Sequence, residues 1–490
     1  MKIPGTTTLF FFPLAISLFV ISGCTSTRVL STYESEKTPR ILTRDVDFAR
    51  QIDALLPDTL FPPSTIALIV GDLNDRSVLY ERNADLLLTP ASNQKLFTSG
   101  AALSILGPSH RFVTTAGIDI SRRTIFLKGG GDPQLTGTDL DLLADTVALY
   151  IGTTGAWSVA GDASLFDSVY WGPGWMWDDA LDPDGMGVTA LTVNANTIDV
   201  NVVAGDNLGS RARITESPPV PFIRVRNETV VVDSVVNPLR VTRPLLHPSN
   251  DIVVQGEIRR GGHRSESIAV WEPDRFAAQL FAEALRDRGV HISDIRLDTM
   301  PRTAVPAGSV VRTLDTVLIS MNKESDNLSA ECLLKTLGAV ETGSPGNWIN
   351  GPSAVRRYLA GEGIDTTKIS LVDGSGLSRY NLTTVRTVFL TLAALYHHPQ
   401  IWSYLVNSLP IAGRDGTLER RMVGTAAEDV VYAKTGTVSG VSSLSGVIEA
   451  KGKNSLAFSM MMENFQASAK SYRAVQDSIV AYIVKTYGIR

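Results

Sequence analysis

The spacing of apolar residues divides the chain into three stretches of different character. In the first, β-branched runs at 65–70 and 77–80 flank a short run of turn residues, which predicts a β-hairpin. Helical spacing precedes the hairpin at 46–56 and follows it after Pro90, a residue suited to the first turn of a helix. The chain is therefore expected to begin with a mixture of helices and paired strands.

The second stretch, from about residue 113 to residue 306, has a different pattern of apolar and turn residues. Short β-type runs dominate it, and turns rich in Gly, Asp and Pro separate them. One helix is expected at 274–288, with Gly289 as its C-cap. Residues 113–306 are therefore predicted to form one or two inserted β-rich domains.

Helical spacing returns in the third stretch, and strand-like runs come near its end. The expected elements are helices at 328–337, 352–360, 383–397 and 401–408, strands at 430–432, 444–449 and 455–462, and a final helix at 474–487. Strand pairs near both ends around a helical middle favour one α/β (α+β) domain made of residues 44–112 and 307–490. Its antiparallel sheet would join the two termini, with helices flanking it.

The first residues have the features of an export signal. The apolar stretch at 9–21 is shorter than the roughly 18 to 20 residues of a spanning helix, so 1–23 is interpreted as a signal peptide. The residues up to Cys24 resemble the lipobox of bacterial lipoproteins, with ordinary signal cleavage as the alternative. We expect an exported, periplasmic protein that a lipid on Cys24 holds at a membrane, the outer membrane in a Gram-negative cell. Residues 24–43, rich in Ser and Thr, would be the tether.

Composition narrows the classes of function. The 490 residues are 44% hydrophobic and carry a formal net charge of −5 without a basic cluster, which argues against a nucleic-acid partner. With Cys24 used for lipid, Cys332 has no partner, so no disulfide is expected and Cys332 is interpreted as a small buried hydrophobe. Metal-ligand spacing is missing from the sequence, and neither a metal nor another cofactor is predicted.

Ser92 and Lys95 form the first candidate chemical site. Positions three apart share one face of a helix, so the Lys95 amine can take the proton of the Ser92 hydroxyl. A lysine can do so only when it is neutral, and its ordinary pKa of about 10.4 must then be lowered by burial or by other cations. A Ser-x-x-Lys match alone is expected about once or twice by chance in a chain of this length.

The segment 325–327 (Ser-Asp-Asn) follows an apolar run and precedes a predicted helix. Ser325 and Asn327 can point together into a cleft, where one relays a proton and the other holds an amide. The alternative is that the segment simply caps the helix, since Ser, Asp and Asn are all favoured at that position.

The third candidate is Lys434-Thr435-Gly436, which follows a β-branched run and precedes Thr437. Lys434 supplies a cation for a carboxylate, and Thr435 supplies a hydroxyl donor. Gly436 leaves room for another backbone to come close. The alternative is a strand with an exposed lysine.

In this order the three motifs resemble those of penicillin-binding proteins and class A β-lactamases. The segments 128–133 (Lys-Gly-Gly-Gly-Asp-Pro) and 373–381 (Asp-Gly-Ser-Gly-Leu-Ser-Arg-Tyr-Asn) narrow the resemblance. They are similar to those of the low-molecular-mass class C penicillin-binding proteins, the D-alanyl-D-alanine carboxypeptidases and endopeptidases. Ser92 and Ser325 are 325 − 92 = 233 residues apart. In this family such a gap holds two inserted β-rich domains, one nested in the other.

The resemblance implies a serine-type D-Ala-D-Ala carboxypeptidase or endopeptidase. Its partners would be peptidoglycan stem peptides as substrates and β-lactams as covalent inhibitors. Ser92 would be the acylated nucleophile, Lys95 its general base and Ser325 the relay that protonates the leaving D-alanine. The other implied contacts are Asn327 with the acyl-side amide, Lys434 and Thr435 with the terminal carboxylate, and the backbone N–H groups of Ser92 and Thr437 with the oxyanion.

Arg379, within the 373–381 motif, has two interpretations. In the family this arginine lies near the pocket for the side chain of the stem peptide, where it can pair with a free carboxylate. The alternative is a structural arginine that holds the Asp373 turn. Asp162, in the inserted stretch, matches the family only loosely and is not assigned to the site.

Two other functions compete with this interpretation. A β-lactamase-like hydrolase would need a dedicated deacylating group, and the sequence has no recognisable Glu in a loop for it. A non-catalytic lipoprotein that binds the cell wall is the second. It has no need for Ser92, Lys95, Ser325 and Lys434 together, which argues against it.

Overall fold

A computed structural model describes residues 46–56, 64–176, 179, 182–243, 249–449, 455–466 and 468–487. The predicted signal peptide (1–23), the lipidation site Cys24 and the tether (24–43) lie outside the described residues. Within the described part of the chain, none of the helices combines the length and apolar character that a membrane crossing requires.

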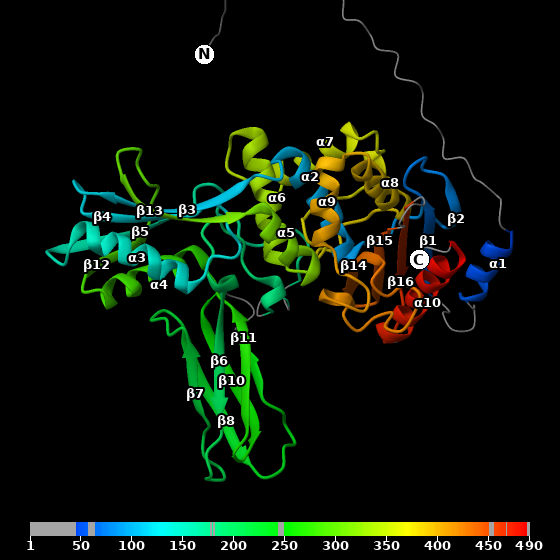
Figure 1. Ribbon diagram of the computed structural model, residues 1–490. Helices are drawn as coiled ribbons and strands as arrows, with labels where there is room; N and C mark the ends of the chain where they lie inside the picture. The colour runs from blue at the N-terminus through cyan, green and yellow to red at the C-terminus, as the bar shows by residue number, and fades with distance from the viewer. Residues whose placement is uncertain are drawn as a thin grey trace, which may run out of the picture. The chain divides into compact units, whose positions relative to one another are not determined.

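A five-stranded antiparallel sheet joins the N-terminal and C-terminal parts of the described chain (Figure 1). Its order is β14-β15-β16-β1-β2, which leaves β14 at an edge. The strands are β1 (Thr65–Asp72), β2 (Val78–Arg82), β14 (Val431–Val438), β15 (Val441–Ile448) and β16 (Leu456–Glu463). The predicted hairpin and the predicted fold class, an α/β domain with an antiparallel sheet, are confirmed.

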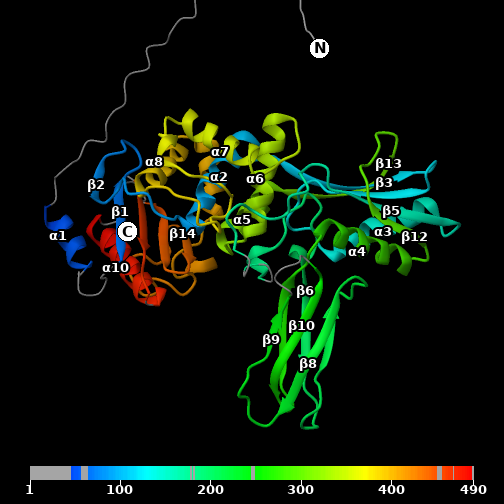
Figure 2. The ribbon, with the colours of Figure 1, turned by 180° about the vertical axis from the view of Figure 1, so that it is seen from behind.

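Alternate residues of β1 enter two different hydrophobic cores, because successive side chains of a strand point to opposite faces. Ala67 and Ile69 pack in one core and Leu68 and Val70 in the other. The helices of the first core are α2 (Lys95–Ile105), α5 (Leu314–Lys323), α6 (Asn327–Thr342), α7 (Asn350–Gly361), α8 (Val385–Tyr396) and α9 (Pro399–Ser408). Those of the second are α1 (Val46–Ala54) and α10 (Ala469–Tyr487), and both views show them across the sheet from α2 and α6 (Figures 1 and 2).

A second five-stranded sheet lies between α2 and α5 in the sequence, with the order β12-β5-β4-β3-β13. Its strands are β3 (Arg111–Asp119), β4 (Thr124–Lys128), β5 (Ala156–Asp162), β12 (His291–Leu297) and β13 (Val305–Thr313), and the helices α3 (Gly137–Ile151) and α4 (Pro273–Asp287) pack against it. The boundaries placed at residues 113 and 306 fall inside β3 and β13, so the strands extend past them. The division into domains stays a prediction.

Two three-stranded sheets, β11-β6-β7 and β8-β10-β9, come from the middle of the same stretch. Their strands are β6 (Thr197–Val203), β7 (Arg213–Ser217), β8 (Arg224–Val232), β9 (Arg240–Thr242), β10 (Asp251–Arg259) and β11 (His263–Ala269). Val200 and Val202 of β6 share a buried core with Ile252 and Val254 of β10. The β-type runs of the sequence therefore form sheets whose apolar faces are covered.

The inserted stretch contains a helix, α3, that the sequence analysis did not predict. Thr136 caps it through a capping box with Asp139. Leu140, Leu143 and Val147 then face the core at helical spacing. The capping residues and the helical spacing are both present in the sequence. The helix was not predicted because β-type runs lie on both sides of it.

We expect Leu334→Ala to lower the free energy of unfolding by about 2–5 kcal/mol, because Leu334 on α6 is fully buried and its loss leaves a cavity. Leu149→Ala, at an exposed position of α3, should change it by less than about 0.5 kcal/mol. Urea unfolding followed by circular dichroism measures both. Equal effects of the two substitutions would contradict the position of α6 in the core.

Candidate active site

Ser92 lies at the start of the helix that carries Lys95. A short 3-10 turn (Ala91–Gln94) leads directly into α2, and Lys95 Nζ is 3.0 Å from Ser92 Oγ. Gly376 packs against this turn, where a Cβ would lie 1.9 Å from the carbonyl oxygen of Ala91. The predicted Ser-x-x-Lys pair is therefore in contact, and a glycine from a distant loop packs closely against the turn that presents Ser92.

The Lys95 side chain is completely buried. Its Nζ also donates to Asn327 Oδ1 at 2.6 Å and to the carbonyl oxygen of Ser375 at 3.1 Å. Burial lowers the pKa of Lys95 from 10.5 to about 8, and four nearby carboxylates oppose this shift: Glu331, Asp326, Asp373 and Asp184. Near pH 8 a large fraction of Lys95 is neutral, which is the condition for a general base.

Asp326 is the residue that caps α6. Its carboxylate accepts from the backbone N–H groups of Leu328 and Ser329, each at 3.1 Å. Ser325 and Asn327 are left to line a cleft. The φ of Ser325 is 64°, in the left-handed region that residues other than glycine rarely adopt. Capping and cleft lining are thus divided among three consecutive residues.

Lys434 lies on the edge strand β14 and is completely buried. Its Nζ donates to Ser325 Oγ at 2.9 Å and to the carbonyl oxygen of Thr435 at 3.0 Å. Burial, followed by the charge of Lys95, lowers the pKa of Lys434 well below its ordinary value. Gly436 lets the strand approach the nucleophile, since a Cβ there would lie 2.9 Å from the backbone nitrogen of Ser92. The alternative of an exposed lysine is wrong.

Two buried carboxylates hold the loop that carries the Ser375 carbonyl. Glu331, one turn after Asn327 on α6, accepts from the backbone N–H groups of Gly374 and Ser375 at 2.8 Å each. Asp373 accepts from two further N–H groups of the same loop. Burial raises the pKa of both carboxyls. Glu331 is not among the site residues predicted from the sequence, although its spacing of four from Asn327 places both on one helix face.

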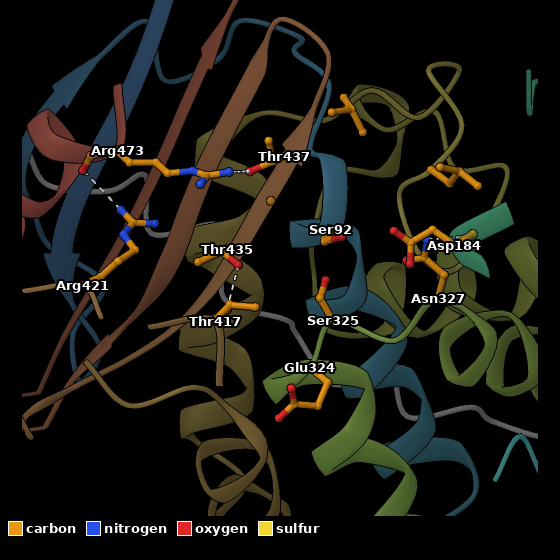
Figure 3. Close-up of a pocket in the computed structure, with 13 residues that line it drawn as sticks. Ser92, Asp184, Glu324, Ser325, Asn327, Thr417, Arg421, Thr435, Thr437 and Arg473 are labelled. Carbon is orange, nitrogen blue, oxygen red and sulfur yellow. Dashed lines mark hydrogen bonds between the residues drawn. The ribbon is translucent and has the colours of Figure 1, made fainter. Parts of the chain in front are cut away.

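A cleft of about 410 Å³ opens at Ser92 (Figure 3). Ser92 and Ser325 lie between two walls, with Asp184 and Asn327 on one side. The opposite wall contains Thr435, Gly436 and Thr437 of β14, which belong to the predicted site. It also contains three residues that were not predicted from the sequence: Thr417, Arg421 and Arg473. Nothing in the local sequence marks the last three, because the fold brings them to the cleft from separate segments.

Arg379 is not among the residues that line this cleft. Its exposed guanidinium donates to the carbonyl oxygen of Ser439, in the turn between β14 and β15. Asp373 is instead held by backbone groups, by Trp175 Nε1 at 3.0 Å and by Asn381 Nδ2 at 2.7 Å. Arg379 therefore does not hold the Asp373 turn, contrary to the structural alternative considered above.

Asp162 ends β5 and is buried. It accepts from the backbone N–H of Met300 at 2.9 Å, within the second sheet and its connections. This contact ties two parts of the inserted stretch together, and Asp162 does not line the cleft.

The arrangement supplies the groups that acyl transfer requires. A hydroxyl contacts an amine of lowered pKa, a second hydroxyl contacts a second buried lysine amine, and the backbone of an edge strand lies beside the nucleophile. A cluster of three or more His, Cys, Asp or Glu side chains suited to a metal is not found among the residues that the structure describes.

The chain is similar to known proteins along most of its length. A family model described as the D-Ala-D-Ala carboxypeptidase 3 (S13) family matches residues 48–485. The chain is 35% identical over 471 residues to the D-alanyl-D-alanine carboxypeptidase of Actinomadura sp. (strain R39), covering 91% of this chain and 86% of that protein. It is 28% identical to the D-alanyl-D-alanine carboxypeptidase DacB of Haemophilus influenzae, with 82% and 86% covered. The crystal structure of penicillin binding protein 4 (dacB) from Haemophilus influenzae matches with a TM-score of 0.76 at 25% identity, covering 89% of this chain and 98% of that one.

We expect acylation of Ser92 to accelerate with pH through about 8, because only neutral Lys95 can accept the Ser92 proton. The neutral fraction grows from roughly a tenth at pH 7 to roughly half at pH 8, so the rate should rise about fivefold. The measurement is the second-order rate constant for labelling by a fluorescent penicillin between pH 6 and 9, with circular dichroism at each pH as the control for folding. A rate that does not change over this range would contradict the role of Lys95.

Proposed function

Because the chain belongs to the D-Ala-D-Ala carboxypeptidase 3 (S13) family, we propose that it removes the terminal D-alanine of peptidoglycan stem peptides through an acyl-enzyme on Ser92. The protein is a penicillin-binding serine carboxypeptidase. The observation that carries the assignment of Ser92 is its 3.0 Å contact with the Nζ of Lys95, a buried amine whose pKa is about 8.

Acylation begins when neutral Lys95 accepts the proton of the Ser92 hydroxyl. The Ser92 oxygen then attacks the carbonyl carbon of the penultimate D-alanine. The negative charge that develops on the carbonyl oxygen is met by the backbone N–H groups of Ser92 and Thr437, and the loss of such a donor typically costs about 3–4 kcal/mol. The close approach of β14 to Ser92 at Gly436 supports this placement.

Collapse of the intermediate breaks the C–N bond and releases D-alanine. Its amine takes a proton from the Ser325 hydroxyl, whose oxygen accepts from Lys434 Nζ at 2.9 Å, and the proton that Lys95 took from Ser92 then restores the Ser325 hydroxyl. Asn327 holds the acyl-side amide in this proposal, and its contact with Lys95 fixes its orientation. A water molecule then attacks the ester, and the same groups transfer the protons in the opposite direction.

The same chemistry cleaves a cross-link when the leaving amine belongs to a second stem peptide. Incubation of the purified protein with defined muropeptides distinguishes the two activities by product mass. Loss of one D-alanine from a pentapeptide marks carboxypeptidase activity, and conversion of a dimer into monomers marks endopeptidase activity.

We expect Ser92→Ala to abolish both covalent labelling by a fluorescent penicillin and release of D-alanine, because the substitution removes the nucleophilic oxygen and leaves the core unchanged. Ser104→Ala, at an exposed position of α2, the helix that follows Ser92, is the matched control and should retain both activities. Gel fluorescence and an assay for free D-alanine measure the outcome.

Labelling that persists in Ser92→Ala would move the nucleophile to another residue. The wild type should release bound penicillin slowly. Fast multiple turnover of penicillin would instead support a β-lactamase-like hydrolase, and a wild type that is not labelled at all would support a non-catalytic wall-binding protein.

We propose further that Cys24 is lipidated after export and holds the protein at a membrane facing the periplasm. The apolar stretch at 9–21 and the small residues that precede Cys24 support this proposal. Cys24→Ser should therefore move the protein from the membrane fraction to the soluble fraction of cells, as detected by immunoblot. A wild type already found in the soluble fraction would contradict lipidation.

A further inference from the structure

The wall of the cleft formed by β14 needs a cation that a substrate carboxylate can reach. Lys434 already uses two of its three donors on Ser325 and on the carbonyl oxygen of Thr435, and its side chain has no exposed surface. Two arginines, Arg421 and Arg473, line the same wall (Figure 3). The two arginines differ in whether their guanidinium groups already form ion pairs with carboxylates of the protein.

Arg421 is engaged in the structure. Its guanidinium pairs with Asp477 at 2.7 Å and donates to Gln476 Oε1 at 3.1 Å, both on α10. It also donates to the carbonyl oxygen of Arg473 at 3.3 Å on the same helix. Arg421 thus fixes the turn of α10 from which the Arg473 side chain extends toward the cleft.

Arg473 has an exposed guanidinium that lines the cleft. Its Nη2 donates to Thr437 Oγ1 at 3.1 Å. In the described part of the chain no carboxylate forms an ion pair with Arg473. A guanidinium has five N–H donors in a planar fork that matches a carboxylate, so most of its donors remain available.

The two threonines of β14 differ in whether their hydroxyl groups are free to donate a hydrogen bond to a carboxylate. Thr435 and Thr437 are two residues apart and therefore share one face of the strand. The Thr435 hydroxyl donates to Thr417 Oγ1 at 2.8 Å. The Thr437 hydroxyl accepts from Arg473, which leaves its own proton free to donate. A carboxylate at Thr437 can thus receive one O–H and several N–H donors.

We propose that Arg473, acting with the Thr437 hydroxyl, binds the carboxylate of the residue that leaves and sets the selectivity for substrates that carry this charge. The inference rests on the proposed function, because the attacked carbonyl lies at the backbone N–H of Thr437 and the carboxylate belongs to the next residue. One residue spans about 3.8 Å between Cα atoms, which keeps the carboxylate near this part of the strand. The contact adds to those that the resemblance implies for Lys434 and Thr435.

The test compares two peptides that differ in one group: an acyl-D-Ala-D-Ala and the same peptide with its C-terminal carboxylate converted to an amide. The ratio of their kcat/KM values measures recognition of the carboxylate. For Arg473→Ala we expect this ratio to fall about 10- to 100-fold, with the loss confined to the acid. Arg473→Lys should recover part of the ratio, since it keeps the charge and loses the planar fork.

Lys470→Ala is the matched control. It removes one positive charge from an exposed position of the same helix, at a residue that does not line the cleft, and should leave the ratio unchanged. Circular dichroism and thermal unfolding verify the fold of each variant. If Arg473→Ala does not fold, the acid-to-amide ratio of Arg473→Lys tests the proposal in its place. A ratio equal to that of the wild type then overturns the proposal.

Three results would contradict the role of Arg473. The wild type does not distinguish the acid from the amide, the ratio is unchanged in Arg473→Ala, or both substrates lose the same factor, as they would if α10 were merely displaced. A wild type that cleaves neither peptide contradicts the proposed function instead. In that case, the two peptides are replaced by a penicillin and its methyl ester. The ratio of their acylation rates measures recognition of the carboxylate by Arg473 without peptide hydrolysis.

Discussion

The desolvation of Lys95 is the constraint on which the rest of the site depends. In water its amine would be protonated at neutral pH, and Ser92 would have no base. The enclosure comes from segments far apart in the chain: Asn327 of α6, the carbonyl of Ser375 and the strand that carries Lys434. The contact of Lys95 Nζ with Ser92 is local, and these three are not. The buried amine that we propose as the base is therefore created by the assembled sheet, helices and loop, and an isolated α2 would not possess it.

The carboxylates near Lys95 are placed so that they limit the effect of burial without cancelling it. A direct ion pair with Lys95 would stabilise the ammonium and raise its pKa. Among the described residues no such pair is present, and Nζ is bound instead by a hydroxyl, an amide oxygen and a backbone carbonyl. Glu331 accepts instead from backbone N–H groups of the loop that carries this carbonyl. Its charge acts at a distance, and the resulting pKa of about 8 keeps the amine close to working pH.

The sequence predicted the parts of the site that local spacing determines. Ser92 and Lys95 are one helical turn apart, so their contact followed from periodicity, and the β-branched run before Lys434 identified its strand. Periodicity also predicted the central sheet, whereas α3 was missed because strands surround it in the sequence. Arg421 and Arg473 were not predictable in the same way. Residues on a loop and on the last helix reach the cleft only through tertiary packing, which no spacing in the chain records.

The inserted stretch has a core of its own and still takes part in the site. The segment after β5 reaches α6 and the Asp373 loop through several polar contacts, and three of them bear on the site. Asp167 pairs with buried Lys335 at 2.8 Å, Trp175 donates to Asp373 at 3.0 Å, and the carbonyl of Asp184 accepts from Asn327 at 2.9 Å.

These contacts end on α6, which carries Asn327, or on the Asp373 loop, which carries the Ser375 carbonyl. The inserted stretch thus supports two of the groups that hold Lys95. It also places Asp184 on the wall opposite the arginines (Figure 3). A peptide in the cleft meets cations on one side and a carboxylate on the other, and this asymmetry exists because the inserted stretch between α2 and α5 brings Asp184 to one wall.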